Sequence, residues 1–153
     1  HTRMAIDVTI GYVIHMLFAA AWTGSILFMT YAVLPVARAG NIETDPFADI
    51  TSRLLTLSRA SAVVLFLTGG HLAGSLYTVD SLTGSTRGYL VLAMLALWFV
   101  LAGLVEVGTK RISAGLSERK IRTPADNARP FFLAGSVVAL LLLVDAGLLL
   151  GNL

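Results

Sequence analysis

Four long apolar runs dominate this 153-residue chain and limit what it can fold into. They cover roughly residues 10–37, 54–77, 88–109 and 131–150, and each reaches the ~20 residues that an α-helix needs to cross a bilayer. The runs are continuous and lack the alternation typical of a membrane β-strand, which excludes a β-barrel. The sequence therefore predicts one all-α domain, an antiparallel bundle of four transmembrane helices.

The overall composition agrees with an integral, multi-pass protein of the cell membrane. Apolar residues make up 56% of the chain and charged residues 13%, and the mean hydropathy is +0.81. So few polar residues cannot cover the surface of a soluble domain of this length. We therefore expect the lipid bilayer to be the main partner of the helices.

The basic residues predict the orientation of the bundle. Nine of the eleven lysines and arginines lie in or beside the first and third connections between the runs. By the positive-inside rule these connections face the cytoplasm, so both termini face outward. The same placement explains the pI of about 9.3 without nucleic acid as a partner. Near the cytoplasmic side, we expect Glu106 to form an interfacial ion pair with Lys110 or Arg111.

The absence of cysteine limits the cofactors that the chain could hold. It excludes disulfides, iron–sulfur clusters, thiolate copper sites and covalently attached c-type haem. Any cofactor must therefore be bound by histidine, methionine or carboxylate side chains.

Four such side chains lie at similar predicted depths in the four helices. Counted from the outer helix ends, His15, His71, Met94 and Asp145 are each five or six residues deep, or about 8–9 Å at the rise of an α-helix. An imidazole in hydrocarbon has no water to satisfy its ring nitrogens, so histidine inside an apolar run indicates a functional site. We therefore expect a site in the outer leaflet.

Two histidines on adjacent helices suit the axial ligation of a b-type haem. Iron would then lie between the imidazoles of His15 and His71, as in other proteins that hold haem through two axial side chains. Phe18 and Trp22 follow His15 at i+3 and i+7, so they share its helix face and could form the wall of a haem pocket.

Small and acidic residues complete this candidate haem site. Gly70 and Gly74 flank His71 and would leave room for a flat ligand, although small residues also serve close helix packing. Asp145 could orient a histidine, accept a proton or be kept neutral by desolvation.

Two alternatives use the same residues. His15, His71 and Met94 could bind a bare metal ion such as copper, for which the thioether is a suitable soft ligand. Alternatively, the two histidines could be structural and form hydrogen bonds across the bundle. Transport of copper by one chain is the weaker hypothesis, because few ligands continue along the inner half, and a pore would require a homo-oligomer.

Several short motifs resemble those of the copper-resistance protein D (CopD) family of membrane proteins. They are His15-x6-Trp22-x-Gly24, Leu34-Pro35, Leu57-Ser58-Arg59-Ala60 and Thr68-Gly69. The His-x6-Trp part is also similar to the haem-binding HemJ-type protoporphyrinogen oxidases, which implies that haem fits this architecture. Both families tend to carry a lysine in the third helix where this chain has Met94, which argues against porphyrinogen oxidation.

The sequence leads to one main hypothesis. The protein is a CopD-like haem protein that transfers electrons near the outer leaflet, and if it is an enzyme, it acts on a quinone or an external redox partner. The alternatives are a copper-binding membrane protein and a small non-catalytic subunit of a respiratory complex.

Overall fold

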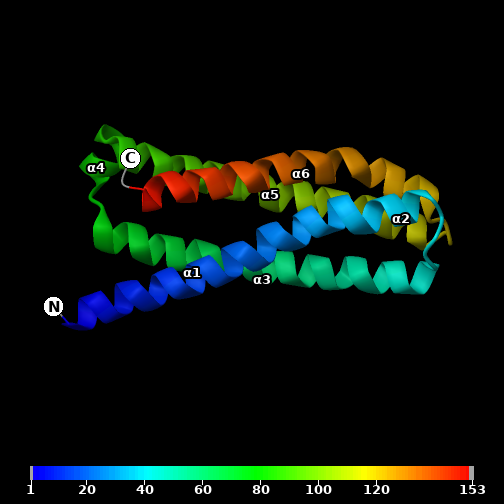
Figure 1. The fold of residues 1–153 in the computed structure, drawn as a ribbon, viewed down its shortest axis with the longest axis horizontal. Coiled ribbons are helices and arrows are strands. Elements are labelled where there is room, and N and C mark those ends of the chain that lie inside the picture. The colour runs from blue at the N-terminus through cyan, green and yellow to red at the C-terminus, as the bar shows by residue number, and fades with distance from the viewer. Residues whose placement is uncertain (1, 152–153) are drawn as a thin grey trace.

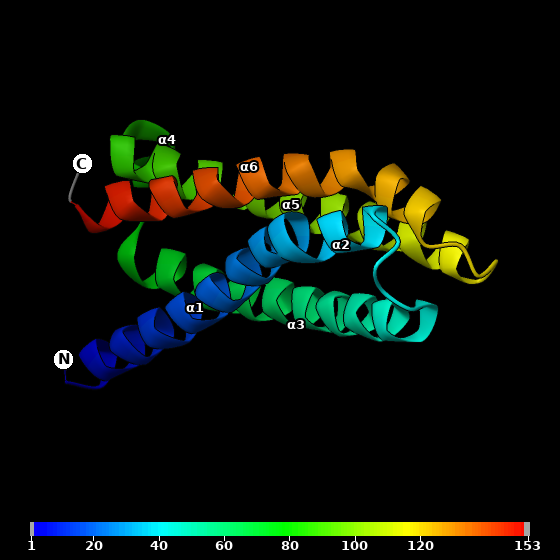
Figure 2. The ribbon, with the colours of Figure 1, turned by 45° about the vertical axis from the view of Figure 1, so that its right-hand side comes forward.

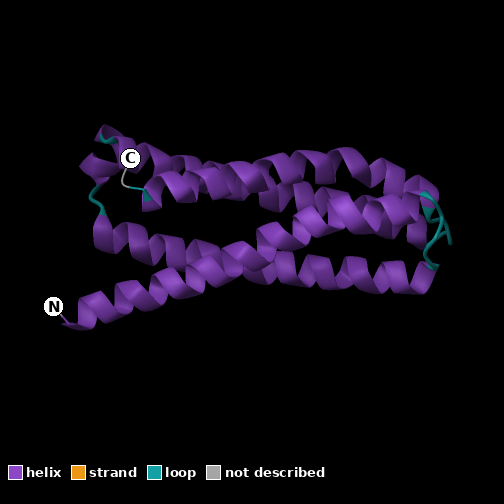
Figure 3. Cartoon of the chain, viewed as in Figure 1, coloured by secondary structure: helices purple, strands orange, loops and turns teal. Residues whose placement is uncertain are grey.

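The computed structural model describes residues 2–151, and this part of the chain contains helices and no strands (Figures 1 and 3). In chain order the elements are α1 (Thr2–Phe28), the π-helix η1 (Met29–Val33), α2 (Leu34–Arg38), α3 (Thr44–Leu76), α4 (Val79–Gly84), α5 (Thr86–Leu116) and α6 (Arg122–Leu150). Four segments have the length and hydropathy to cross a membrane: 6–38, 44–76, 86–116 and 122–150. This confirms the predicted all-α bundle of a multi-pass membrane protein.

The four long helices form a ring in which sequence neighbours are antiparallel. α3 packs against α1 and α5, and α6 packs against α5 and α1, so α1 and α5 lie diagonally across the bundle. The N-terminus, the C-terminus and α4 lie at one end, called here the terminal end (Figure 1). The connections α2–α3 and α5–α6 lie at the other, the loop end.

All four spans are longer than predicted. α3 begins at Thr44 rather than near residue 54, α6 begins at Arg122 rather than near 131, and α5 ends at Leu116 rather than near 109. Hydropathy marks only the part of a helix that suits lipid, and polar turns can continue the helix beyond it. In α3, Asp45 is favourable at the positive end of the helix dipole, and Pro46 fits the first turn because no intrahelical bond needs its missing N–H.

The first span changes its hydrogen-bond pattern before Pro35. The Leu34 N–H donates to Met29 O, one residue further back than in an α-helix. This π-turn comes directly before a proline, which cannot donate and which crowds the preceding turn. Beside it, Ser136 Oγ of α6 lies 2.8 Å from Thr30 Oγ1, so a polar contact holds this irregular segment against its neighbour.

Hydroxyl caps order the connection at the terminal end. Thr78 Oγ1 accepts from the Ser81 N–H and Ser81 Oγ accepts from the Thr78 N–H, which forms a capping box at the start of α4. Ser85 Oγ then accepts from the Gly88 N–H and starts α5. A side chain at position 88 would collide with the Ser81 carbonyl, so glycine is required where α4 folds back on α5.

Packing is tight toward the loop end and looser toward the terminal end. In α5, a Cβ on Gly108 would lie 2.8 Å from the Phe132 ring, and one on Gly115 would overlap Pro124. Fully buried Trp22 and Ile26 extend this core along α1. Toward the terminal end, α1 and α3 diverge from α5 and α6 (Figures 1 and 2). The divergence separates the two helix pairs where the candidate ligands lie.

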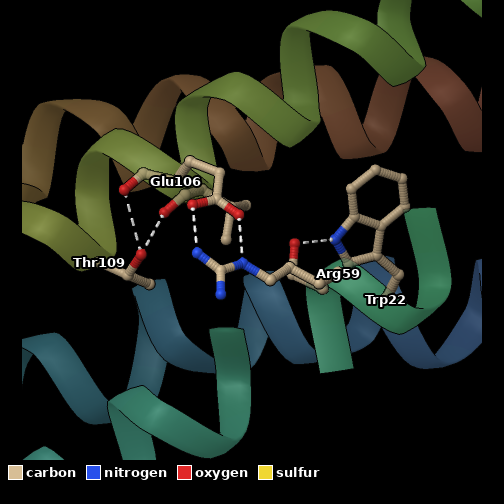
Figure 4. A network of polar contacts seen from close by, with 6 residues as sticks. Trp22, Arg59, Glu106 and Thr109 are labelled. Carbon is tan, nitrogen blue, oxygen red and sulfur yellow. Dashed lines mark hydrogen bonds and ion pairs between the residues drawn. The ribbon is translucent and has the colours of Figure 1, made fainter. Parts of the chain in front are cut away.

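The expected ion pair of Glu106 forms with a different partner. Arg59 of α3 donates to Glu106 of α5 through two nitrogens, at 2.8 and 3.1 Å (Figure 4). Lys110 and Arg111 lie on the same helix as Glu106, whereas Arg59 approaches from the neighbouring antiparallel helix at the same level. The prediction of Lys110 or Arg111 as the partner is therefore wrong, and the pair links two helices.

Candidate functional site

A cavity of about 370 Å³ lies between all four long helices, in the half of the bundle toward the terminal end. This volume is typical of small-molecule and cofactor sites. Its lining is mostly apolar and includes three large aromatic side chains. The lining residues used below are His15, Trp22, Phe66, Gly69, Gly70, Met94 and Trp98.

His15 is held by a hydrogen-bond chain that fixes its tautomer. His15 Nδ1 lies 2.7 Å from Thr68 Oγ1, and Thr68 Oγ1 lies 2.8 Å from the Val64 carbonyl oxygen. Since the carbonyl can only accept, the hydroxyl proton of Thr68 belongs to that bond, and Nδ1–H of His15 must donate to Thr68 Oγ1. We therefore assign the proton to Nδ1. The lone pair is then on Nε2, which has no hydrogen-bond partner among the described residues.

Met94 lines the same cavity from the diagonally opposite helix. His15 lies on α1 and Met94 on α5. Both are at one level of the bundle, as their contacts with α3 show. His15 bonds to Thr68 of α3. Two residues away on α3, Phe66 packs against Trp98 with ring centroids 5.3 Å apart, and Trp98 lies one turn from Met94 on α5. The cavity thus has a nitrogen and a thioether sulfur, two ligand atoms for a soft or borderline metal.

Two tryptophans form rigid walls of the cavity. Trp22 is fully buried, and its indole N–H donates to Ser58 Oγ at 2.8 Å (Figure 4). The indole N–H of Trp98 donates to the Ala62 carbonyl at 3.0 Å. Because each polar atom has its partner on α3, both rings present apolar surface to the cavity without leaving a buried donor unsatisfied.

Two glycines widen the cavity on the α3 side. A Cβ on Gly70 would meet no atom within 4 Å, whereas one on Gly69 would lie 3.5 Å from His15 Cε1. The absence of side chains at these positions leaves open space beside the imidazole. Gly70 therefore lies in the cavity wall, next to open space.

His71 does not lie in the cavity. Its side chain is exposed, and its Cδ2 atom would be 3.6 Å from a Cβ on Gly11, one helical turn outward from His15. The cavity face of α3 contains Phe66, Gly69 and Ala73, and a turn of 100° per residue directs His71 away from that face. The structure does not bring the two histidines together as a ligand pair.

The other expected site residues also lie outside the cavity lining. Phe18 packs against the core, and Gly74 has open space around it. Asp145 is 6% exposed, and its Oδ2 atom has no hydrogen-bond partner in the described part of the chain. Of the eight expected site residues, the cavity contains His15, Trp22, Gly70 and Met94. Sequence reasoning missed Phe66 and Trp98, although Trp98 lies about one turn from Met94 on the same helix, which was a usable signal.

A smaller cavity of about 110 Å³ continues from the first toward the terminal end. It shares His15 and Met94 with the larger cavity and adds Tyr12, Tyr77 and Arg87. This smaller cavity is also mostly apolar, but Arg87 and the two tyrosines bring polar groups to it near the first turn of α5, and we call this end of the cavity its mouth.

A third cavity, of about 500 Å³, lies at the loop end between the start of α3 and the end of α5. It is lined mainly by threonine and serine, with an exposed pair of Arg119 and Asp45 at 3.8 Å. Among the described residues, no group of three or more histidine, cysteine, aspartate or glutamate side chains could hold a metal ion. We take the cavity lined by His15 and Met94 as the candidate site, because it lies between all four long helices and contains two possible ligand atoms.

Comparisons with protein-family models, with curated proteins and with solved structures each give no significant match.

Proposed function

We propose that the cavity binds a b-type haem with His15 and Met94 as axial ligands, and that the protein transfers electrons in the membrane. One observation carries the proposal: a single apolar cavity, walled by tryptophan, contains both an imidazole with an available Nε2 lone pair and a thioether. Histidine and methionine together are an established axial pair for haem, and haem supplies a one-electron iron couple when bound.

The donor atoms fit this ligand pair better than the pair of histidines that the sequence predicted. His15 and Met94 line one cavity from diagonal helices, whereas His71 is directed elsewhere. The same nitrogen and sulfur would also suit Cu(I). A bare ion, however, would fill only a small part of a 370 Å³ space, so the volume favours an organic ligand over a bare copper ion.

Each neighbouring residue has a definite role in this proposal. Thr68 keeps the Nε2 lone pair of His15 directed to the metal, as an acceptor to the other ring nitrogen does in metal sites. Trp22 and Trp98 exclude water, and a dry site with a thioether ligand favours reduced iron. The chain would therefore act as a relatively oxidising electron carrier, in keeping with its CopD-like motifs.

The position of the cavity mouth indicates from which side of the membrane a redox partner would approach. The site opens toward the terminal end, which the positive-inside rule assigns to the outer side of the membrane. A quinone in the outer leaflet or an external redox protein could approach there.

Haem titration of the purified protein and its variants tests the proposal. Wild-type protein should bind one haem and show sharp α and β bands when reduced, as low-spin six-coordinate haem does. His15→Ala should abolish binding and Met94→Ala should broaden the bands, whereas His71→Ala, the matched control, should leave the spectrum unchanged. Haem-free protein after expression with adequate haem would refute the proposal. Loss of the spectrum in His71→Ala would instead support His15 and His71 as the two haem ligands.

A further inference from the structure

The mouth of the cavity contains a half-buried cation without an acidic partner. Arg87 lies in the first turn of α5 and lines the smaller cavity with Tyr12 and Tyr77. Its Nη1 atom donates to the Leu149 carbonyl of α6 at 2.9 Å. No carboxylate of the described residues lies within ion-pair distance of its guanidinium group.

This guanidinium has binding capacity that the chain does not use. Arginine carries five N–H donors in a planar fork that matches carboxylate and phosphate oxygens. The bond to Leu149 uses one of them and fixes the side chain between α5 and α6, beside the apolar cavity. A charge held this way at a membrane boundary is stabilised by an anion more than by neutral partners.

We propose that Arg87 binds the carboxylate end of the ligand whose apolar body lies in the cavity. The inference rests on the proposed haem function, because the propionates are the anionic end of haem. The ligand then lies between Trp22 and Trp98 with its propionate edge at Arg87, toward the terminal end. Arg87 thereby selects an amphiphile with an acidic edge over a wholly apolar molecule of the same shape.

Esterified haem separates this contact from the rest of the site. We would titrate apoprotein in uncharged detergent with haem b and with haem b dimethyl ester, in wild type, Arg87→Gln and Arg87→Lys. Arg129→Gln is the matched control, since Arg129 is exposed and lies in the part of α6 toward the loop end, two turns after Arg122. In wild type, esterification should weaken binding about 10- to 100-fold, as expected for the loss of charge-assisted hydrogen bonds.

The substitution should remove the effect of the ester. Arg87→Gln should weaken binding of haem b by a similar factor and should bind the ester and the free acid about equally, whereas Arg87→Lys should retain part of the preference. Arg129→Gln should match wild type.

Equal affinity of wild type for both haem forms would overturn the inference, and is the result expected if Arg87 holds a lipid phosphate instead. The inference would also be overturned if esterification weakened binding to Arg87→Gln as much as it weakens binding to wild type. In both cases haem still binds, so the proposed function stands. Failure of wild type to bind either form would refute the proposed function itself. The wild-type arm needs no variant, so misfolding of Arg87→Gln would not block the test.

Discussion

Replacing Thr68 with valine tests how the protein orients its cavity-lining histidine. Valine has nearly the shape of threonine but cannot accept the proton of His15 Nδ1, which lies 2.7 Å from the hydroxyl. The ring N–H would then face apolar surroundings, and the imidazole would be free to rotate or to move its proton to Nε2. Either change removes the lone pair from the cavity.

The size of the effect follows from the single bond that is lost. Removing the partner that orients a metal-bound histidine costs about 10- to 100-fold in affinity, or about 1.4–2.8 kcal/mol. The range agrees with the penalty of about 1–3 kcal/mol for leaving a buried donor unsatisfied. We therefore expect Thr68→Val to weaken haem binding within this range while the helices still form.

Equilibrium haem titration with circular dichroism of the same samples provides the assay. Thr68→Ser keeps the hydroxyl and should bind within about threefold of wild type, well inside the tenfold that 1.4 kcal/mol represents. If Thr68→Val binds haem as tightly as wild type, the hydrogen bond does not orient His15, and the tautomer argument fails.

Three further changes test the scaffold. Ser58→Ala leaves the buried Trp22 N–H unsatisfied, so the thermal unfolding midpoint should fall with a loss of about 1–3 kcal/mol; an unchanged midpoint would mean that the indole finds another acceptor. Gly108→Ala should cost about 1–3 kcal/mol because its Cβ overlaps Phe132, whereas Gly103→Ala on the same helix meets no atom within 4 Å and is the control. For topology, a reporter fused at the C-terminus should be active only outside the cytoplasm and one in the α5–α6 connection only inside, and the reverse pattern would contradict the positive-inside assignment.

The four spans and their order could be predicted because the hydropathy of a segment depends only on the residues in that segment. The helix limits could not, because the polar turn at Asp45 and the short helix α4 lie outside the apolar runs. The π-turn before Pro35 was also not predicted, since it depends on how the backbone adjusts to the missing N–H within a packed bundle.

The sequence allowed the depth of each candidate ligand to be estimated, but not the direction of its side chain around the helix axis. Counting residues placed His15, Met94 and His71 at a common level, and the first two do line one cavity. The direction of a side chain around the helix axis depends on which neighbour the helix packs against. In a soluble helix an apolar stripe reveals that direction, but residues 62–76 of α3, which surround His71, are apolar on most faces, so the sequence could not show that His71 faces away.

The identity of the axial ligands is the most direct test of the central claim. Near-infrared magnetic circular dichroism of the oxidised, haem-loaded protein distinguishes histidine–methionine from bis-histidine ligation by the energy of a charge-transfer band. The expected result is the histidine–methionine signature, its replacement by another signature in Met94→Leu, and no change in His71→Ala. A bis-histidine signature in wild type that disappears in His71→Ala would contradict the assignment of His15 and Met94.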